Sequence, residues 1–235
     1  MNLKITSFNC QSFNCNVEIV SDLMKECDFL LLQETFLSDN CIDELSVLGH
    51  NYSYFAEAAT RNAHSFRGRA SGGLAIIFKK EFVPFVEFFH YSSRIMGLYL
   101  KFDGITYLLV NVYLPCDYGT TDSFTEYMSY LAELSNICNL NTFDEIIIAG
   151  DFNCDPNRGR FYDETMKLLK QHFLFMADVT NLPPDSYTYM SRNASCSTSW
   201  LDHIVTSKFD NIKYIEISYR ITLDNKFCYF NGKLF

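Results

Sequence analysis

Short runs of apolar residues, most of them followed by a polar residue, recur along the whole chain. The run at residues 145–149, Glu-Ile-Ile-Ile-Ala, is typical of a strand that is buried on both faces. Gly150 ends it, where the backbone must turn or approach something closely. The same pattern predicts further strands at residues 3–8, 28–33, 74–78, 105–113, 186–191 and 200–206.

Between these strands, apolar residues spaced three or four apart predict helices. The clearest helix spans residues 124–138, and Ser123 with Glu126 forms a capping box at its start. Further helices are predicted at residues 17–25, 38–48 and 162–172, with Gly49 as the terminator of the second. Because strands and helices alternate throughout, the fold class is α/β or α+β with mixed sheets.

Composition limits the class of protein. The 235 residues are 48% hydrophobic and 16% aromatic, which is enough for a substantial core, and no linker divides residues 1–235, so we expect a single domain. No apolar run reaches membrane-spanning length and the N-terminus lacks the apolar core of a signal peptide. We therefore expect a soluble, intracellular protein that is not secreted and enters no membrane. Nine scattered cysteines without a Cys-x-x-Cys pair are expected to be reduced core residues.

The net charge of −9 opposes broad electrostatic adhesion to nucleic acid. It still allows a local basic rim. Arg61, Arg67 and Arg69 fall in one polar stretch, and Arg158 and Arg160 form a second group. Such clusters are either solvated surface or substrate contacts, and Arg69 and Arg158 are our candidates for substrate binding.

Polar residues stand at the ends of several predicted strands. Asp151 and Asn153 follow the first strand described above, two residues apart, so an extended chain would project both to the same side. Asn9 and Gln11 repeat this spacing, and Glu34 ends another strand. A carboxylate and an amide in one cleft suit a hydrated divalent cation and a phosphate. The alternatives are an ordinary turn and a solvated strand edge.

Two further features bear on this cleft. Tyr113 shares a strand face with Asn111 and could present its hydroxyl to the cleft. The paired glycines Gly72 and Gly73 allow a tight entry to the next strand or a close approach by ligand or backbone, and we favour a strand hairpin.

Asp202 and His203 are neighbours in a predicted strand, so their side chains point to opposite faces. They cannot easily form one catalytic pair, and one of them is expected to be structural. The other histidines stand at no metal-ligand spacing and are expected at the surface or as satisfied core residues: His50, His64, His90 and His172.

Several motifs together identify a family resemblance. In order along the chain they are Ser7-Phe-Asn9, Leu32-Gln-Glu34-Thr, Asn111-Val-Tyr113-Leu-Pro, Gly150-Asp-Phe-Asn153 and Trp200-Leu-Asp202-His-Ile. Over nearly its whole length the chain resembles the endonuclease/exonuclease/phosphatase superfamily, whose members include pancreatic deoxyribonuclease and apurinic/apyrimidinic endonucleases. The stretch Ser71-Gly-Gly-Leu-Ala-Ile-Ile-Phe and the tryptophan motif resemble in particular the endonuclease domain of non-LTR (LINE-type) retrotransposons.

This resemblance implies a DNase I-like fold: a four-layer sandwich of two mixed sheets packed face to face, with helices on the outer faces. It implies that Glu34 holds Mg²⁺ or Mn²⁺ and that Asn9 supports the metal site. Asp151 would orient and deprotonate the attacking water, while Asn153 and Tyr113 would donate hydrogen bonds to the scissile phosphate. Thr188 would be a further phosphate or backbone contact.

The chain departs from the family near its end. Asp202 normally orients a histidine that belongs to a C-terminal Ser-Asp-His, whereas this chain reads Leu223-Asp224-Asn225. Asp224 fits the family's aspartate, but Asn225 cannot carry a proton or a positive charge. The loss of such a group typically costs about 10²- to 10⁴-fold in rate.

The resemblance therefore predicts a metal-dependent endonuclease that nicks one strand of DNA and leaves a 3′-hydroxyl. In a retrotransposon this end would prime a downstream reverse transcriptase domain, and the site of action would be nuclear. The alternatives are a phosphatase for an inositol or another small phosphoester, and a catalytically silent domain that keeps the fold.

Overall fold

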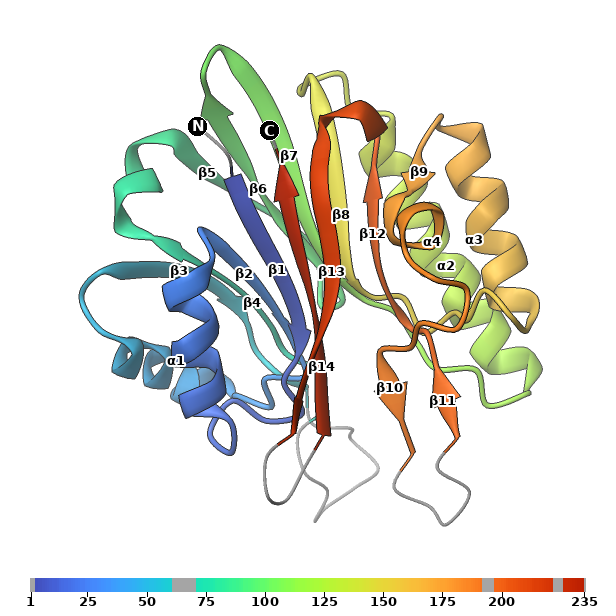
Figure 1. The fold of residues 1–235 in the computed structure, drawn as a ribbon, viewed down its shortest axis with the longest axis horizontal. Helices are drawn as coiled ribbons and strands as arrows, with labels where there is room; N and C mark the ends of the chain where they lie inside the picture. Colours follow the sequence, from blue (N-terminus) through green and yellow to red (C-terminus); the bar gives the residue numbers. More distant parts are fainter. Residues whose placement is uncertain (1–2, 61–70, 192–196, 222–225, 235) are drawn as a thin grey trace.

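The computed structural model describes residues 3–60, 71–191, 197–221 and 226–234. Two six-stranded sheets pack face to face and helices cover their outer faces, which gives the expected four layers (Figure 1). The predicted fold class is confirmed. No helix in the described part of the chain is long and apolar enough to cross a membrane.

The first sheet carries both ends of the described chain. Its β1 and β2 strands run parallel and the other neighbours run antiparallel. In spatial order its strands are β13 (Ile212–Ile221), β14 (Lys226–Leu234), β1 (Leu3–Asn9), β2 (Phe29–Gln33), β4 (Leu74–Lys79) and β3 (Tyr52–Glu57).

The second sheet is also mixed, because β7 and β8 are parallel within an otherwise antiparallel arrangement. A separate two-stranded ribbon joins β10 (Tyr189–Met190) and β11 (Thr198–Ser199). In spatial order the second sheet contains β5 (Val86–Ser92), β6 (Ile95–Phe102), β7 (Ile105–Tyr113), β8 (Glu145–Asp151), β12 (Asp202–Thr206) and β9 (Phe175–Met176).

Helices pack on the two outer faces (Figure 1). Residues of α1 and η1 share a buried cluster with the outer face of the first sheet, and residues of α2 and α3 share one with the second sheet. The helical elements are α1 (Val17–Glu26), η1 (Asp39–Leu48), η2 (Lys80–Phe85), α2 (Thr121–Cys138), α3 (Arg160–Gln171), α4 (Ala177–Asn181) and η3 (Phe209–Asn211).

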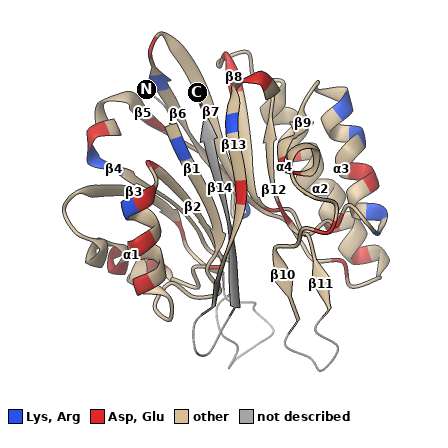
Figure 2. Cartoon of the chain, in the orientation of Figure 1, with Lys and Arg blue, Asp and Glu red and all other residues tan. Residues whose placement is uncertain are grey.

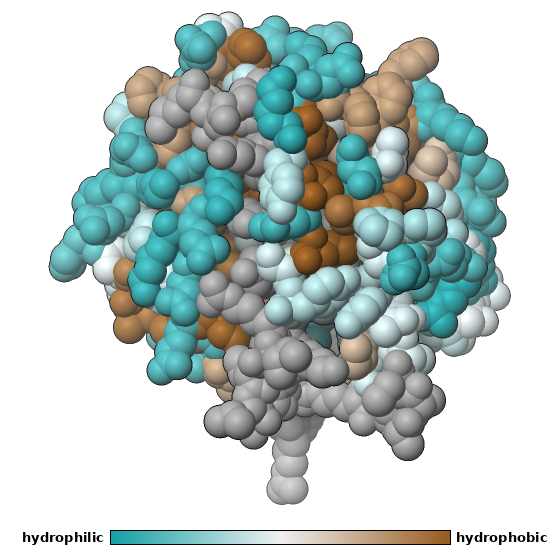
Figure 3. Space-filling view, in the orientation of Figure 1, coloured by the Kyte–Doolittle hydropathy of each residue, from teal (hydrophilic) through white to brown (hydrophobic). Residues whose placement is uncertain are grey.

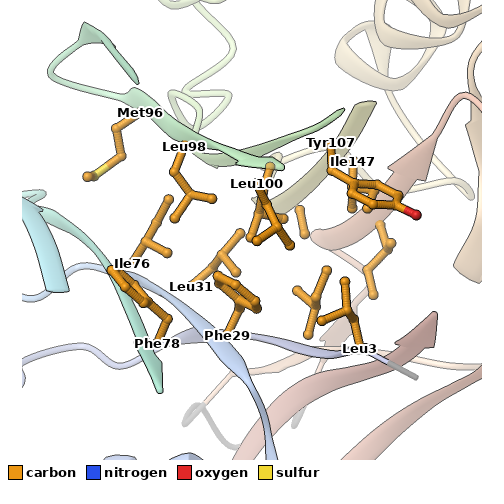
Figure 4. Packing of buried hydrophobic residues seen from close by; sticks show 14 of the residues in the cluster. Leu3, Phe29, Leu31, Ile76, Phe78, Met96, Leu98, Leu100, Tyr107 and Ile147 are labelled. Carbon is orange, nitrogen blue, oxygen red and sulfur yellow. The ribbon is translucent and has the colours of Figure 1, made fainter. Parts of the chain in front are cut away.

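The core between the sheets shows why the central strands are apolar on both faces. In β2, Phe29 and Leu31 belong to the cluster between the sheets (Figure 4), whereas Leu30 and Leu32 belong to the cluster under α1. Successive side chains of a strand point to opposite faces, so a strand covered on both sides needs an unbroken apolar run. β8 follows the same rule.

The core also reaches the surface beside β13. Figure 3 shows apolar residues exposed where β13 faces α4, and Ile215 and Ile217 of β13 and Leu182 after α4 all pack against the core between the sheets. Charged residues are distributed differently: on α3, basic and acidic residues are interspersed (Figure 2).

Three local predictions need correction. The capping box at Ser123 is wrong: α2 begins earlier, and the Thr120 side chain caps it by accepting a hydrogen bond from the Ser123 backbone N–H at 3.1 Å. The helix predicted at residues 38–48 is a 3₁₀ helix, Asp39–Leu48, rather than an α-helix. The strand predicted at residues 186–191 shrinks to Tyr189–Met190, because its only partner in the described residues is the equally short β11.

Candidate active site

Four strand ends meet at one edge of the sandwich. β1 and β2 are parallel in the first sheet, so Asn9 and Glu34 emerge at the same edge. β7 and β8 are parallel in the second sheet, where Tyr113 lies opposite Asp151. Neither pair is close in the sequence, and only the stacking of the two sheets brings both pairs together.

The side-chain amide of Asn9 joins the two sheets at this edge. Its Nδ2 donates to Glu34 Oε1 and to Asp151 Oδ2, both at 2.9 Å, while its Oδ1 accepts a hydrogen bond from the Gln11 backbone N–H at 3.2 Å. The Gln11 contact fixes the orientation of the amide. Glu34 and Asp151 are therefore held side by side, as the resemblance predicts for a metal site and its catalytic base.

A third carboxylate adjoins this pair. Asp202 lies opposite Asp151 in the antiparallel pairing of β12 with β8. Burial raises the pKa of Asp202 to about 7, and the Glu34 carboxylate adds to the rise. Burial, the Asp202 carboxylate and the Glu34 carboxylate all raise the pKa of Asp151 well above its usual range. The three carboxyl groups thus oppose one another's ionisation.

The donor set suits a hard divalent cation that keeps several waters. In the described part of the chain, no three His, Cys, Asp or Glu side chains approach closely enough to hold a metal ion by themselves. Mg²⁺ commonly takes one or two carboxylates and completes its shell with water and substrate phosphate. Glu34 and the Asn9 amide, beside the buried carboxyl of Asp151, fit that kind of site.

The backbone at Glu34 is in the left-handed region, with φ of +53°. This conformation is uncommon for a residue other than glycine, asparagine or aspartate, and neighbouring hydrogen bonds hold it. The Glu34 carbonyl accepts from the Ser12 N–H at 2.8 Å, and the Thr35 N–H donates to the Gly73 carbonyl at 3.2 Å. The glutamate is therefore presented by a turn rather than by a continuing strand.

The close contact between Thr35 and Gly73 explains the second of the paired glycines. A Cβ on Gly73 would collide with the Thr35 side chain, and Gly73 also has φ of +86°. β3 and β4 are antiparallel neighbours, as the hairpin interpretation predicts. The close approach that Gly73 permits is therefore made by the chain after Glu34.

Asn153 reaches the site by a different route from the one predicted. The chain turns after Asp151 instead of staying extended: Asp151 Oδ1 accepts from the Asn153 N–H at 2.9 Å, and Asn153 has φ of +50°. Its Nδ2 donates to the Leu114 carbonyl at 2.8 Å and its Oδ1 accepts from the Cys116 thiol at 3.2 Å. The turn, and not an extended two-residue spacing, therefore determines where Asn153 lies relative to Asp151.

Asn153 also lines a pocket of about 430 Å³. The pocket continues past Cys116 and Asp117 to the turn at Asp155 and Arg158.

Tyr113 remains a hydrogen-bond donor. Burial raises the pKa of its phenol well above the usual range, and the Glu34 and Asp151 carboxylates add to the rise. The guanidinium carbon of Arg94 lies 4.9 Å from the centre of the Tyr113 ring. Arg94 was not predicted from the sequence, because it stands alone between two strands and no motif marks it.

His203 points away from the site, as its strand position predicts. Its Nδ1 lies 2.7 Å from Asp178 Oδ2 and its Nε2 lies 2.8 Å from the Cys154 carbonyl oxygen. Both ring nitrogens therefore face acceptors, and only the imidazolium can donate to both. Burial is the largest single contribution and opposes the charged ring, but Asp178 and Cys154 together outweigh it and raise the His203 pKa well above its usual range.

Two side chains named as candidate substrate contacts, Thr188 and Arg158, form hydrogen bonds within the protein. The Thr188 hydroxyl oxygen accepts from the Leu201 and Asp202 N–H groups at 2.9 and 3.0 Å, so it holds the backbone of β12. Arg158 donates to Asp155 Oδ2 at 3.2 Å and to the Ser199 hydroxyl.

Some residues named as candidates from the sequence lie outside the described residues. They are Arg69, Asp224 and Asn225, together with Arg61 and Arg67. Seven cysteines are free thiols, as expected, but only three of these seven are buried core residues, namely Cys10, Cys27 and Cys154, and Cys15 is exposed.

A family model described as "Endonuclease/Exonuclease/phosphatase family" matches residues 6–213. A search of curated proteins finds no significant match.

Solved structures with a similar fold include the apurinic/apyrimidinic endonuclease LMAP from Leishmania major, with a TM-score of 0.80, 15% identity, and coverage of 99% of this chain and 87% of that one. The 3′ phosphatase NExo from Neisseria, bound to a product DNA hairpin, gives a TM-score of 0.77 and 15% identity, and the match covers 99% of both chains. The endonuclease domain of TRAS1, a telomere-specific non-LTR retrotransposon, gives 0.69 and 13%, with coverage of 99% and 98%. At these identities the likeness establishes the fold.

Proposed function

The chain belongs to the endonuclease/exonuclease/phosphatase family, and from this premise we propose that it is a divalent-metal-dependent phosphodiesterase that nicks one strand of DNA and leaves a 3′-hydroxyl. One observation carries the proposal: the Asn9 amide holds the carboxylates of Glu34 and Asp151 together across the two sheets. A metal-holding carboxylate beside a buried carboxyl of raised pKa is the combination that phosphodiester hydrolysis needs.

Each residue then has a role. Glu34 and Asn9 hold the metal, which when bound neutralises charge on the phosphate. Asp151 orients the attacking water and accepts its proton.

Hydrogen bonds to the phosphate complete the arrangement. Tyr113 donates its phenolic proton to a phosphate oxygen. The half-buried Asn153 amide has one N–H committed to Leu114 and offers the other. Thr188 holds the backbone of Asp202 in place beside Asp151. Asp224 and Asn225 complete the set in this proposal, with Asn225 as a hydrogen-bond donor that cannot transfer a proton.

Two solved structures with a similar fold support DNA as the substrate. NExo is described with a product DNA hairpin, and TRAS1 is a retrotransposon endonuclease domain. By the same analogy we propose that the 3′-hydroxyl primes a reverse transcriptase encoded downstream in the same element, acting in the nucleus. We propose Arg69 and Arg158 as the cationic contacts to DNA. Arg69 lies outside the described residues, and 62% of the Arg158 side chain is exposed.

A phosphatase acting on phosphomonoesters is the second candidate. NExo is named as a 3′ phosphatase, and the acidic net charge does not oppose a small substrate. A silent domain is the third, because Asn225 replaces a histidine that can carry a proton.

Plasmid nicking in Mg²⁺ tests these alternatives. We expect the protein to convert supercoiled plasmid to the open circle without releasing phosphate from small phosphoesters. Asp151→Ala should lower the rate by about 10²- to 10⁴-fold, because the water loses its base. Asp163→Ala, which removes an exposed carboxylate on α3, is the matched control and should leave the rate unchanged.

The phosphatase and the silent domain each predict a different outcome of this experiment. Phosphate release without nicking would replace the nuclease by the phosphatase. Nicking that appears only after Asn225→His would establish the silent domain.

A further inference from the structure

Arg94 lies in the turn between β5 and β6, and its guanidinium contacts Tyr113 and the helix α2. Its Nη1 donates to the Tyr113 carbonyl oxygen at 3.2 Å, and its own carbonyl accepts from the Tyr113 N–H at 2.9 Å. Its guanidinium carbon lies 4.9 Å from the centre of the Tyr113 ring. The arginine therefore holds both the backbone and the ring of Tyr113.

The arginine is in turn held by α2. Its guanidinium carbon lies 5.8 Å from the centre of the Tyr130 ring, and its Nη2 lies 3.8 Å from Glu126 Oε1. The side chain is 28% exposed, so it is packed rather than free in solvent. A guanidinium held between two aromatic rings has few orientations open to it.

The Tyr113 hydroxyl itself has no hydrogen-bond partner among the described residues, although burial and two carboxylates act on it. The ring also passes close to Gly72, where a Cβ would lie 3.9 Å from Tyr113 Cε1. The hydroxyl is therefore available to a ligand, and packing, not a hydrogen bond of its own, determines where it points.

We infer that Arg94 is a positioning residue that fixes the Tyr113 hydroxyl toward the scissile phosphate and supplies positive charge over its ring. This inference rests on the proposed function for the role of Tyr113. A cation against the ring face favours the ring as a hydrogen-bond donor to an anion, and it offsets the repulsion between the phosphate and the carboxylates of Glu34 and Asp151.

A double-mutant cycle on plasmid nicking tests the inference. Arg94→Met should lower kcat roughly 10- to 100-fold with little change in KM, since a small displacement of a catalytic group is costly. Tyr113→Phe removes the hydroxyl that Arg94 positions. In the Tyr113→Phe background the Arg94→Met change should therefore add less than about 2-fold.

Control variants isolate the contact. Lys101→Met removes an exposed cation at the other end of β6 and should leave nicking unchanged. Arg160→Met removes a guanidinium that also lies over aromatic rings, 4.8 Å from the centre of Phe124, and is the control for the spectroscopic signal. Glu126→Gln removes only the ion pair of Arg94 with α2 and should have an effect below about 2-fold. Thermal unfolding confirms that each variant is folded at the assay temperature.

A readout that needs no activity separates this inference from the proposed function. In protein labelled with ¹³C at tyrosine Cζ, the Tyr113 signal is assigned by its loss in Tyr113→Phe. Arg94→Met should shift that signal, and Arg160→Met should not.

Two results would overturn the inference: an unshifted Tyr113 signal in Arg94→Met, or an undiminished effect of Arg94→Met in the Tyr113→Phe background, which would mean direct contact with substrate. If the parent cleaves no DNA while the signal shifts, the proposed function fails and the positioning by Arg94 stands.

Discussion

Individual residues at this site act through buried hydrogen bonds rather than through exposed charges. His203 is the clearest case, because it lies behind Asp202 and ties the Cys154 carbonyl, one residue beyond Asn153, to Asp178 in α4. The interaction is an ion pair in which neither side chain is exposed. The turn that carries Asn153 is therefore anchored from the side opposite the active site.

Stability should depend on the charge of His203. Its folded pKa is raised above an unfolded value of about 6.5, so its contribution is complete below about pH 6.5 and is lost as pH rises through the folded pKa. The parent should exceed His203→Gln in free energy of unfolding most at low pH, and the difference should shrink as pH rises. Urea unfolding across this range measures it. A difference that grows with pH would mean a neutral ring.

The Thr120 hydroxyl is a second residue with one clear task, since it caps α2 by accepting from the Ser123 N–H. Thr120→Ala should lower the free energy of unfolding by about 1 kcal/mol. Thr125→Ala removes a threonine in the body of the same helix and serves as the control. Equal losses in both variants in urea unfolding would show that the cap contributes nothing particular.

At the scale of the element, β2 contributes side chains to the core and also positions a residue of the active site. Its apolar residues pack against both neighbouring layers, and Glu34 follows directly at its end. A buried polar contact beneath the site also joins the two sheets: Gln33 of β2 donates to Asn111 Oδ1 of β7 at 2.7 Å. The strand therefore fixes the position of the glutamate through both kinds of contact.

Loss of apolar packing in β2 should be costly. Leu31→Ala removes a fully buried side chain between the sheets and should lower the free energy of unfolding by about 3 kcal/mol. Val47→Ala alters a side chain that is 65% exposed and should change the free energy of unfolding by less than about 0.5 kcal/mol. Chemical unfolding compares them. A small loss for Leu31→Ala would mean that the sheets close over the cavity.

At the scale of the whole molecule, the active site is a junction between two sheets. Glu34 comes from the first sheet and Asp151 from the second, and Asn9 connects them. A cation held here lies between the two halves of the sandwich, so its binding should stabilise the fold as a whole.

Mg²⁺ should therefore raise the melting temperature. At a concentration of about 100 times Kd the stabilisation is about 2.7 kcal/mol, which corresponds to roughly 5 to 10 °C for a chain of this size. Glu34→Ala should abolish the shift, and Asp163→Ala should retain it. Calorimetry with Mg²⁺ and with EDTA measures the effect. An equal shift in Glu34→Ala would place the ion elsewhere.

The sequence by itself determined the identity of the polar strand ends and half of the strands in the two sheets. The strands β3, β5, β6, β9, β13 and β14 were not predicted. Apolar runs marked β2, β7 and β8 within about two residues, because a strand buried on both faces leaves a pattern that depends only on its own side chains. The alternation of side chains also placed Asp202 and His203 on opposite faces, and the structure confirms it.

Only the tertiary structure decided how those residues meet. The turn at Asn153, the left-handed backbone at Glu34 and the contact of Arg94 with Tyr113 depend on partners far away in the chain. Asn9 and Asp151, for example, are 142 positions apart yet share a hydrogen bond. A local pattern records which face of a strand a residue occupies, but the stacking of the sheets decides what lies across from it, and that depends on the whole chain at once.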